Sequence, residues 1–240
     1  MKPLPQATAT PSAEMALIPL PDFVHFPKTD LHLELRSVDR ALGEAIIARG
    51  AQQGLALGTT LVKPTWAWRG ALPEIFSAGT AVRVVEHEVL MEGGYRIVLH
   101  GEYRFELAAE APPGDGADGL LRLALVRRLE EPFLSDIDPE IMALRDELVA
   151  SLGALAGALG GRFPIDAGQL AELDDADVSF EGLVNAVASA LDLSPLRKQA
   201  LLADALPERA RNLRGLLRSR VSMMELLRPF QHLATHADRN

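Results

Sequence analysis

Short runs of alternating apolar and polar residues fill the first half of the chain, and glycine, proline or aspartate bounds most of them. Alternation with a period of two is typical of half-buried β-strands. The pattern predicts strands over residues 16–20, 30–36, 54–62, 79–90, 95–101, 103–110 and 120–129. Because proline donates no backbone hydrogen bond, we expect Pro19, Pro21 and Pro27 at strand ends and not inside the sheet.

One helix is predicted within this β region, over residues 37–50. Ser37 is a suitable N-cap, and Gly50 suits a left-handed stop at the other end. The sequence Met-Glu-Gly-Gly-Tyr at 91–95 predicts a tight hairpin turn, because glycine adopts positive φ without steric cost. Short strands punctuated by proline are expected in a small, strongly coiled β-barrel.

The second half of the chain has a different apolar period, about 3.6 residues, which predicts helices. Asp138 followed by Pro139, Ser179, and Ser194 followed by Pro195 mark helix starts. The last helix carries an apolar stripe made of Ala210, Leu213, Leu217, Val221 and Met224.

These patterns predict an α+β chain in three parts. Residues 1–14 hold little apolar bulk and should form a flexible leader, because they bury too little surface to offset their ordering entropy. Residues 15–133 should form the small β-barrel domain with its one helix. Residues 134–240 should form an all-α helical bundle domain of four or five helices.

Composition narrows the classes of function. The chain has 240 residues, a formal charge of −9 and no cysteine, so disulfides, thiolate metal sites and cysteine nucleophiles are excluded. The acidic balance weighs against a dedicated nucleic-acid surface, and we do not expect nucleic acid as a partner. No apolar run approaches the roughly 18 residues of a membrane helix, and no secretory signal opens the chain. We therefore expect no membrane association and a cytoplasmic location.

No motif in the sequence specifies a reaction. Lys28-Thr29 lacks the glycines of a phosphate-binding loop, and Pro27 offers no amide there. The run Gly-Asp-Gly-Ala-Asp-Gly at 114–119 has the glycine spacing of a dinucleotide fingerprint, but a β run follows it where a helix is required. The six histidines lack zinc-site spacing, and no Gly-x-Ser-x-Gly occurs. We expect no catalytic residue, metal or cofactor.

Two tryptophans are the best candidates for a binding site. Trp66 and Trp68 lie in a loop rich in proline and glycine, with Phe76 at its far end. Large apolar side chains on a loop often anchor a protein partner, so the three residues are candidate polypeptide contacts. The alternative is that the rings close the open end of the barrel.

An arginine-rich stretch near the end of the chain is the second candidate surface. It contains Arg209, Arg211, Arg214, Arg218 and Arg220. Such a helix could contact nucleic acid, but a solvated helix face has the same composition. Because acidic helices belong to the same predicted domain, we favour the solvated face.

Three segments together resemble the amino-terminal domain of the ATP-dependent protease Lon. They are LIPLPDFVHFPKTDLHLEL at 17–35, SAGTAVRVVEHEVLMEGGYRIVLHGEYRFEL at 77–107 and LSPLRKQALLADALPERARNL at 193–213. The resemblance covers roughly residues 15–228, with two departures. Lys28 stands where the family usually has glycine after Phe-Pro, and Leu-Arg-Ser at 35–37 replaces a more apolar strand end. The resemblance implies a PUA-like β-domain followed by a helical bundle.

The resemblance also implies a function. In Lon this region helps to engage unfolded or damaged polypeptides ahead of the motor and protease, and neither of those follows residue 228 here. We therefore expect a stand-alone, non-enzymatic module that binds exposed apolar segments, as an adaptor or as a partner of a protease or chaperone. The alternative is an RNA-binding protein, because PUA-like domains also serve that purpose.

Overall fold

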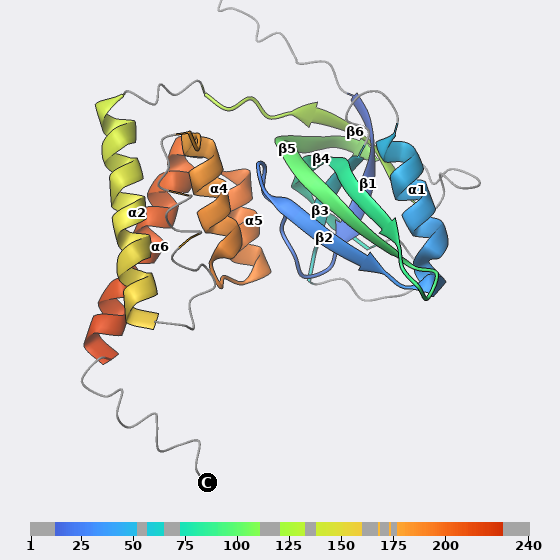
Figure 1. The fold of residues 1–240 in the computed structure, drawn as a ribbon. Helices are drawn as coiled ribbons and strands as arrows, with labels where there is room; N and C mark the ends of the chain where they lie inside the picture. The colour runs from blue at the N-terminus through green and yellow to red at the C-terminus, as the bar shows by residue number, and fades with distance from the viewer. Residues whose placement is uncertain are drawn as a thin grey trace, which may run out of the picture. The chain divides into compact units, whose positions relative to one another are not determined.

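The chain forms two compact units, Met1–Glu130 and Glu131–Asn240. This computed structural model describes residues 13–51, 57–64, 73–110, 121–132, 138–159, 168, 173 and 177–227. Strands dominate the first unit and helices the second (Figure 1).

The first unit contains strands, one short 3-10 turn and one α-helix. They are β1 (Ala13–Leu20), β2 (Asp30–Leu35), η1 (Ser37–Asp39), α1 (Arg40–Gly50), β3 (Leu57–Val62), β4 (Ile75–Val89), β5 (Tyr95–Glu110) and β6 (Arg122–Arg128). The two runs predicted at 95–101 and 103–110 form the single long strand β5. Strand β4 begins at Ile75, earlier than predicted.

The strands form one mixed sheet in the order β2-β5-β4-β3-β1-β6. Only the pair β1–β3 is parallel among the described strands. Strand β5 is long enough to pair with β2 along its first half and with β6 along its second, so the sheet curls back on itself (Figure 1). Because β2 pairs with β5 alone in the described part, the sheet keeps an edge. The predicted small barrel is corrected to a curled mixed sheet.

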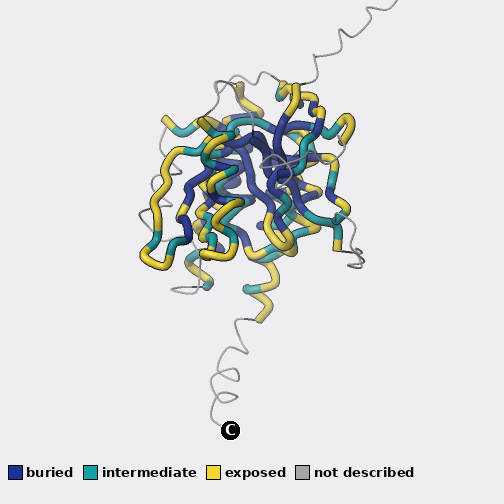
Figure 2. The backbone as a smooth tube through the Cα atoms, turned by 90° about the vertical axis from the view of Figure 1, so that its right-hand side faces the viewer, coloured by how far each residue is buried: buried dark blue, intermediate teal, exposed yellow. Residues whose placement is uncertain are grey.

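Strand β1 is buried on both faces. Ala16, Ile18 and Leu20 join one apolar cluster, whereas Met15 and Leu17 join another that includes Phe105. Two-sided burial explains why the run Met-Ala-Leu-Ile lacks alternation. Figure 2 shows the buried backbone gathered inside the curled strands.

The prolines of the opening segment are placed partly as predicted. Pro21 follows β1 directly, and Pro27 precedes the turn at Lys28. Pro19, however, lies inside β1 and is aligned with Thr60 of β3. The pairing of β1 with β6 stops at Leu17, so Pro19 has a strand neighbour on one side only, where a missing N–H is tolerated.

Helix α1 occurs where it was predicted, but both predicted end signals are wrong. The Ser37 side chain caps nothing, because residues 37–39 form a 3-10 turn before the helix begins at Arg40. Gly50 does not adopt positive φ. Packing requires glycine at this position instead, because a Cβ at Gly50 would lie 2.4 Å from the Val84 side chain.

The second unit is helical in its described residues. Its helices are α2 (Pro139–Leu159), α4 (Phe180–Ala190), α5 (Pro195–Ala203) and α6 (Leu206–Leu227). The predicted starts are confirmed, since Asp138 accepts a hydrogen bond from the Glu140 amide, Ser179 from Gly182 and Ser194 from Arg197. Leu213 and Leu217 are buried as predicted. The described residues therefore combine a six-stranded mixed sheet with five α-helices.

Candidate functional site

The predicted aromatic site is described only in part. Trp66 and Trp68 lie outside the described residues. Phe76 belongs to β4 and is half-buried, so it is part of the sheet and not of the loop. At the base of the loop, the Lys63 amide donates to the Glu74 carbonyl at 2.8 Å, and their side chains pair at 3.2 Å. The described ends of this segment, Lys63 and Glu74, therefore lie side by side.

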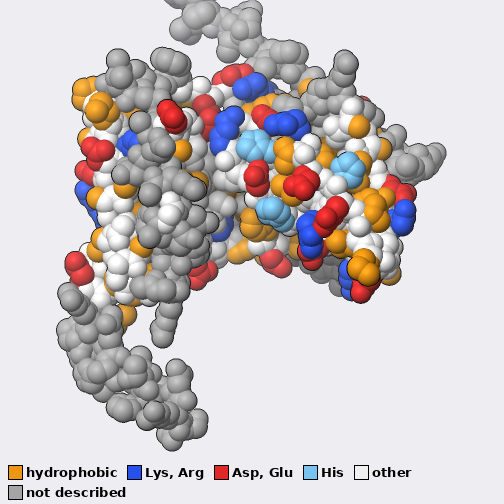
Figure 3. Space-filling model, viewed as in Figure 1, with side chains coloured by type: hydrophobic (Ala, Val, Ile, Leu, Met, Phe, Trp, Pro, Cys, Tyr) orange, Lys and Arg blue, Asp and Glu red, His pale blue; other side chains and the backbone are white. Residues whose placement is uncertain are grey.

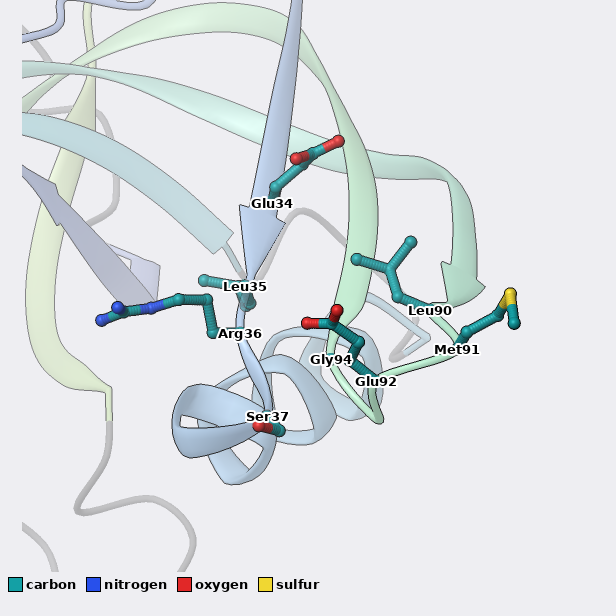
Figure 4. Close-up of a pocket in the computed structure, with 8 residues that line it drawn as sticks. All are labelled: Glu34, Leu35, Arg36, Ser37, Leu90, Met91, Glu92 and Gly94. Carbon is teal, nitrogen blue, oxygen red and sulfur yellow. The ribbon is translucent and has the colours of Figure 1, made fainter.

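A pocket of about 190 Å³ lies in the first unit where β2 ends beside the β4–β5 hairpin (Figure 4). We call it the hairpin pocket. It is lined by Glu34, Leu35, Arg36, Ser37, Leu90, Met91, Glu92 and Gly94. These residues come from two segments more than fifty positions apart in sequence, which the pairing of β2 with β5 brings together.

Two glycines shape the hairpin pocket. Gly93 adopts a φ of +83° and its amide donates to the Leu90 carbonyl at 2.8 Å, which closes the predicted hairpin turn. Gly94 allows a close approach instead, because a Cβ there would lie 2.1 Å from the Leu35 carbonyl oxygen. Any larger residue at Gly94 would push the end of β2 away from the hairpin.

Exposed apolar residues include one residue that lines this pocket and two that adjoin lining residues in sequence. Met91 lines it and is fully exposed, and Val89, two positions earlier in the sequence, is 59 % exposed. Val38, which follows the lining residue Ser37, is 78 % exposed. We call Val38, Val89 and Met91 the apolar rim. Larger contiguous apolar patches are typical of partner-binding surfaces, whereas single exposed apolar residues are common.

The charged groups next to the pocket engage one another. Arg96 donates to Glu34 at 3.0 Å and also to Glu88, which joins β2, β5 and β4 in one ion network. Hydrogen bonding by Glu34 and the charge of Glu88 raise the pKa of Arg96. Arg40 pairs with Glu44 at 2.9 Å. With their carboxylate partners, these arginines do not form a site for an anionic ligand.

The arginine-rich helix α6 is a mixture of buried and paired groups. Arg209, which the sequence placed on the exposed face, is fully buried. Arg211 pairs with Glu140 at 3.2 Å, and Arg214 and Arg218 both pair with Glu147. Acidic helix α2 thus neutralises much of the basic surface, which weighs against nucleic-acid binding.

Two histidines of the first unit, His25 and His100, form ordinary contacts. His25 is buried and hydrogen-bonds the Thr29 carbonyl at 2.9 Å, and His100 pairs with Asp30 at 2.7 Å. Within the described residues, no three histidine or acidic side chains are grouped to hold a metal ion. No helix in that part of the chain has the length and apolar character needed to cross a membrane.

Sequence reasoning did not find the hairpin pocket. It predicted the turn at residues 91–95 but treated it only as a connection between strands. The available signal was Met91, an apolar residue placed at the tip of a turn, where polar residues are usual. The contribution of β2 was not accessible, because it depends on strand order.

Comparison with known proteins gives one match to a family and a consistent set of structures. The family described as the substrate-binding domain of the ATP-dependent protease La (Lon) matches residues 14–218. None of the curated proteins searched matches the chain.

Two solved structures share the fold. The N-terminal domain of a Mycobacterium avium complex Lon protease has a TM-score of 0.61 at 22 % identity, covering 88 % of this chain and 98 % of that one. A Lon N-terminal domain protein from Xanthomonas campestris has a TM-score of 0.55 at 20 % identity, covering 84 % of this chain and 96 % of that one. With the family match over residues 14–218, the conclusion is that the chain belongs to the Lon substrate-binding domain family.

Proposed function

We propose that this chain is a non-enzymatic module that binds exposed apolar segments of unfolded or damaged polypeptides. The observation that carries the proposal is the match of residues 14–218 to a domain whose described role is to bind the substrates of a protease. In this role the chain acts as an adaptor, or as a partner of a protease or chaperone.

The hairpin pocket and the apolar rim are the proposed contact surface. Met91 is unbranched and flexible, so it adapts to apolar side chains of different shapes, as a module with many clients requires. Burying one such side chain is worth about 1.5–3 kcal/mol. Two or three contacts of this size give weak, reversible binding, which suits a module that releases its clients.

The loop with Trp66 and Trp68, together with Phe76, is the second proposed contact. Aromatic rings bury much area at a small entropic cost, which makes them effective anchors for a polypeptide. Lys63, Pro64 and Arg69 surround the two tryptophans with residues that prefer solvent or bends, which supports exposure of the rings.

Fluorescence anisotropy of a labelled polypeptide that is kept unfolded by alkylation tests the proposal. We expect binding, and we expect the double variant Val89→Ser with Met91→Ser to weaken it by about tenfold. Met142→Ser, at a half-exposed methionine of α2, is the matched control and should bind as the parent does. Absence of binding at high micromolar protein, beside a working positive control, would refute the proposal.

A further inference from the structure

Strand β2 forms an open edge of the sheet (Figure 1). It pairs antiparallel with β5 over Asp30–Leu35, and the structure describes no strand on its other side. Natural sheets often protect such an edge with proline, a bulge, lysine or other charged side chains. Strand β2, with the sequence Asp-Leu-His-Leu-Glu-Leu, has no proline, lysine or bulge, and its charged residues are Asp30 and Glu34.

The hydrogen bonds of Gly101 identify the β2 residues that face the open side. The Gly101 carbonyl accepts from the Lys28 amide, and the Gly101 amide donates to the Thr29 carbonyl. Backbone groups alternate in direction along a strand, so Leu99, Ile97 and Tyr95 also point toward β2. Their register partners in β2 are Leu31, Leu33 and Leu35.

The amides and carbonyls of Asp30, His32 and Glu34 therefore point away from the sheet. All three residues are exposed, and no backbone hydrogen bond of theirs occurs on that side within the described chain. The open edge therefore presents the backbone N–H and C=O groups of these three residues in a row. This is enough to align a short added strand.

We propose that β2 accepts an extended polypeptide segment as an added strand, with its end at the hairpin pocket. This inference rests on the proposed function and deepens it, because it states how a client backbone is held. Main-chain hydrogen bonds depend little on side chains, so strand addition suits a module that binds many sequences. Glu34 and Leu35, at the end of β2, line the hairpin pocket. A strand added beside β2 would therefore direct one of its side chains toward the pocket.

The two faces of β2 define the chemistry of the segment. Leu33 and Leu35 are half-buried on one face, so apolar side chains of the added strand would extend the core there. The other face presents Asp30, which pairs with His100, and Glu34, which shares Arg96 with Glu88, so these three carboxylates face a single arginine. Cross-strand pairs of opposite charge are favourable. The preferred client segment alternates apolar with basic residues. Figure 3 shows acidic, basic and histidine side chains intermixed on the face over β2, β5 and β4.

A proline variant tests the edge in the whole chain. His32→Pro removes one outward N–H but no hydrogen bond to β5, whereas His32→Ala removes the side chain and keeps the N–H. The probe is a fluorescein-labelled peptide of alternating lysine and valine. We expect His32→Pro to weaken binding by about tenfold or more and His32→Ala by less than about twofold. A folded His32→Pro protein that binds like the parent would overturn the inference.

Peptide chemistry gives a second test that needs no variant. One peptide carries an N-methyl group on the backbone nitrogen of every lysine, and the other on that of every valine. Alternate residues point their N–H groups to opposite edges of a strand, so each peptide has one edge blocked. Loss of binding by only one of the two supports strand addition, and equal effects would overturn it. A peptide of alternating glutamate and valine should bind more weakly than the lysine peptide.

The two proposals fail in different ways. If the alkylated unfolded polypeptide does not bind, the proposed function is wrong. If it binds, but His32→Pro has no effect and the two N-methylated peptides behave alike, only strand addition is wrong.

Discussion

Lys28 shows how a single departure from a family pattern appears in three dimensions. The backbone φ of Lys28, +60°, lies in the left-handed region. Among the described residues, Lys28 is the only one other than glycine with a positive φ. The turn is held by the Lys28 amide, which donates to the Gly101 carbonyl at 2.8 Å, and by Thr29, whose hydroxyl donates to the Phe26 carbonyl. Glycine, usual at this position in the family that the chain resembles, fits this conformation without strain.

Replacing Lys28 with glycine should therefore stabilise the protein. We expect a gain of about 0.5–1 kcal/mol in the free energy of unfolding, measured by urea denaturation, because relief of left-handed strain exceeds the added entropy of the unfolded chain. Lys28→Ala keeps a Cβ and should give no such gain. A Lys28→Gly protein less stable than the parent would contradict this explanation.

His25 makes the stability of the first unit depend on pH. Its Nε2–H donates to the Thr29 carbonyl, and its Nδ1 is buried without a protein partner in the described residues. Burial lowers the pKa of His25 below the ordinary 6.5, against a smaller opposing effect of the Thr29 bond. His100 also lowers the pKa of His25 electrostatically, and Asp30 raises it. As the pH falls below 6.5, the unfolded chain takes up a proton that the folded chain does not, so stability is lost.

His25→Gln should reduce this loss. We expect the free energy of unfolding to fall less steeply between neutral and mildly acidic pH than in the parent, by up to about 1.4 kcal/mol per pH unit. His32→Gln, at an exposed position, is the control. Parallel profiles for parent and His25→Gln would show that His25 does not contribute.

Among the helices, α6 is anchored by a buried charge. The Arg209 guanidinium donates to Asn185 Oδ1 at 2.5 Å, to Glu131 Oε1 at 3.0 Å and to the carbonyl of Leu201 at 2.9 Å. The other Glu131 oxygen accepts from the Leu206 amide at the start of α6. One carboxylate therefore caps the helix and neutralises its buried arginine.

Arg209→Ala should destabilise the second unit by about 3–5 kcal/mol, because it removes the buried guanidinium that neutralises Glu131 and donates to Asn185 Oδ1. Arg211→Ala removes an exposed arginine two positions along and should cost less than about 1 kcal/mol. Chemical unfolding followed by helix circular dichroism compares the two. Equal losses would argue against a special role of the buried arginine.

The hairpin from β3 to β4 carries the predicted tryptophan site. Because Trp66 and Trp68 are the only tryptophans, intrinsic fluorescence reports on this loop alone. We expect red-shifted emission that iodide quenches. We also expect Trp66→Ala with Trp68→Ala to weaken polypeptide binding by about tenfold while thermal stability is kept. Blue-shifted emission insensitive to iodide would remove both residues from the binding surface.

The sequence predicts local structure better than it predicts the neighbours of each element. The caps at Asp138, Ser179 and Ser194 involve residues a few positions apart, so their patterns are readable. The edge position of β2 depends on the order of all the strands, which alternation does not encode. Buried Arg209 was missed because its charge suggested exposure, although Leu206 and Leu213 place it on the apolar side of α6.

For the whole chain we predict a protease-sensitive connection between the units. Glu131 is held by α6, so we expect the cut between residues 133 and 138 and not at Glu131 itself. Residues 1–14 and 112–119 should also be cut early, because their composition is poor in apolar bulk. Limited proteolysis with mass spectrometry tests this prediction. A first strong cut inside α2, within 139–159, would contradict it.

The central position of β1 has a consequence for how the chain folds as it is synthesised. The β4–β5 hairpin pairs neighbours in sequence and can form early, but β1 must wait for β3 and then for β6, more than a hundred residues later. Until β6 is made, a strand that is apolar on both faces has one side open. A nascent chain stalled before Arg122 would thus expose an aggregation-prone segment. During its own synthesis, the protein briefly exposes an apolar segment of the kind that it is proposed to bind.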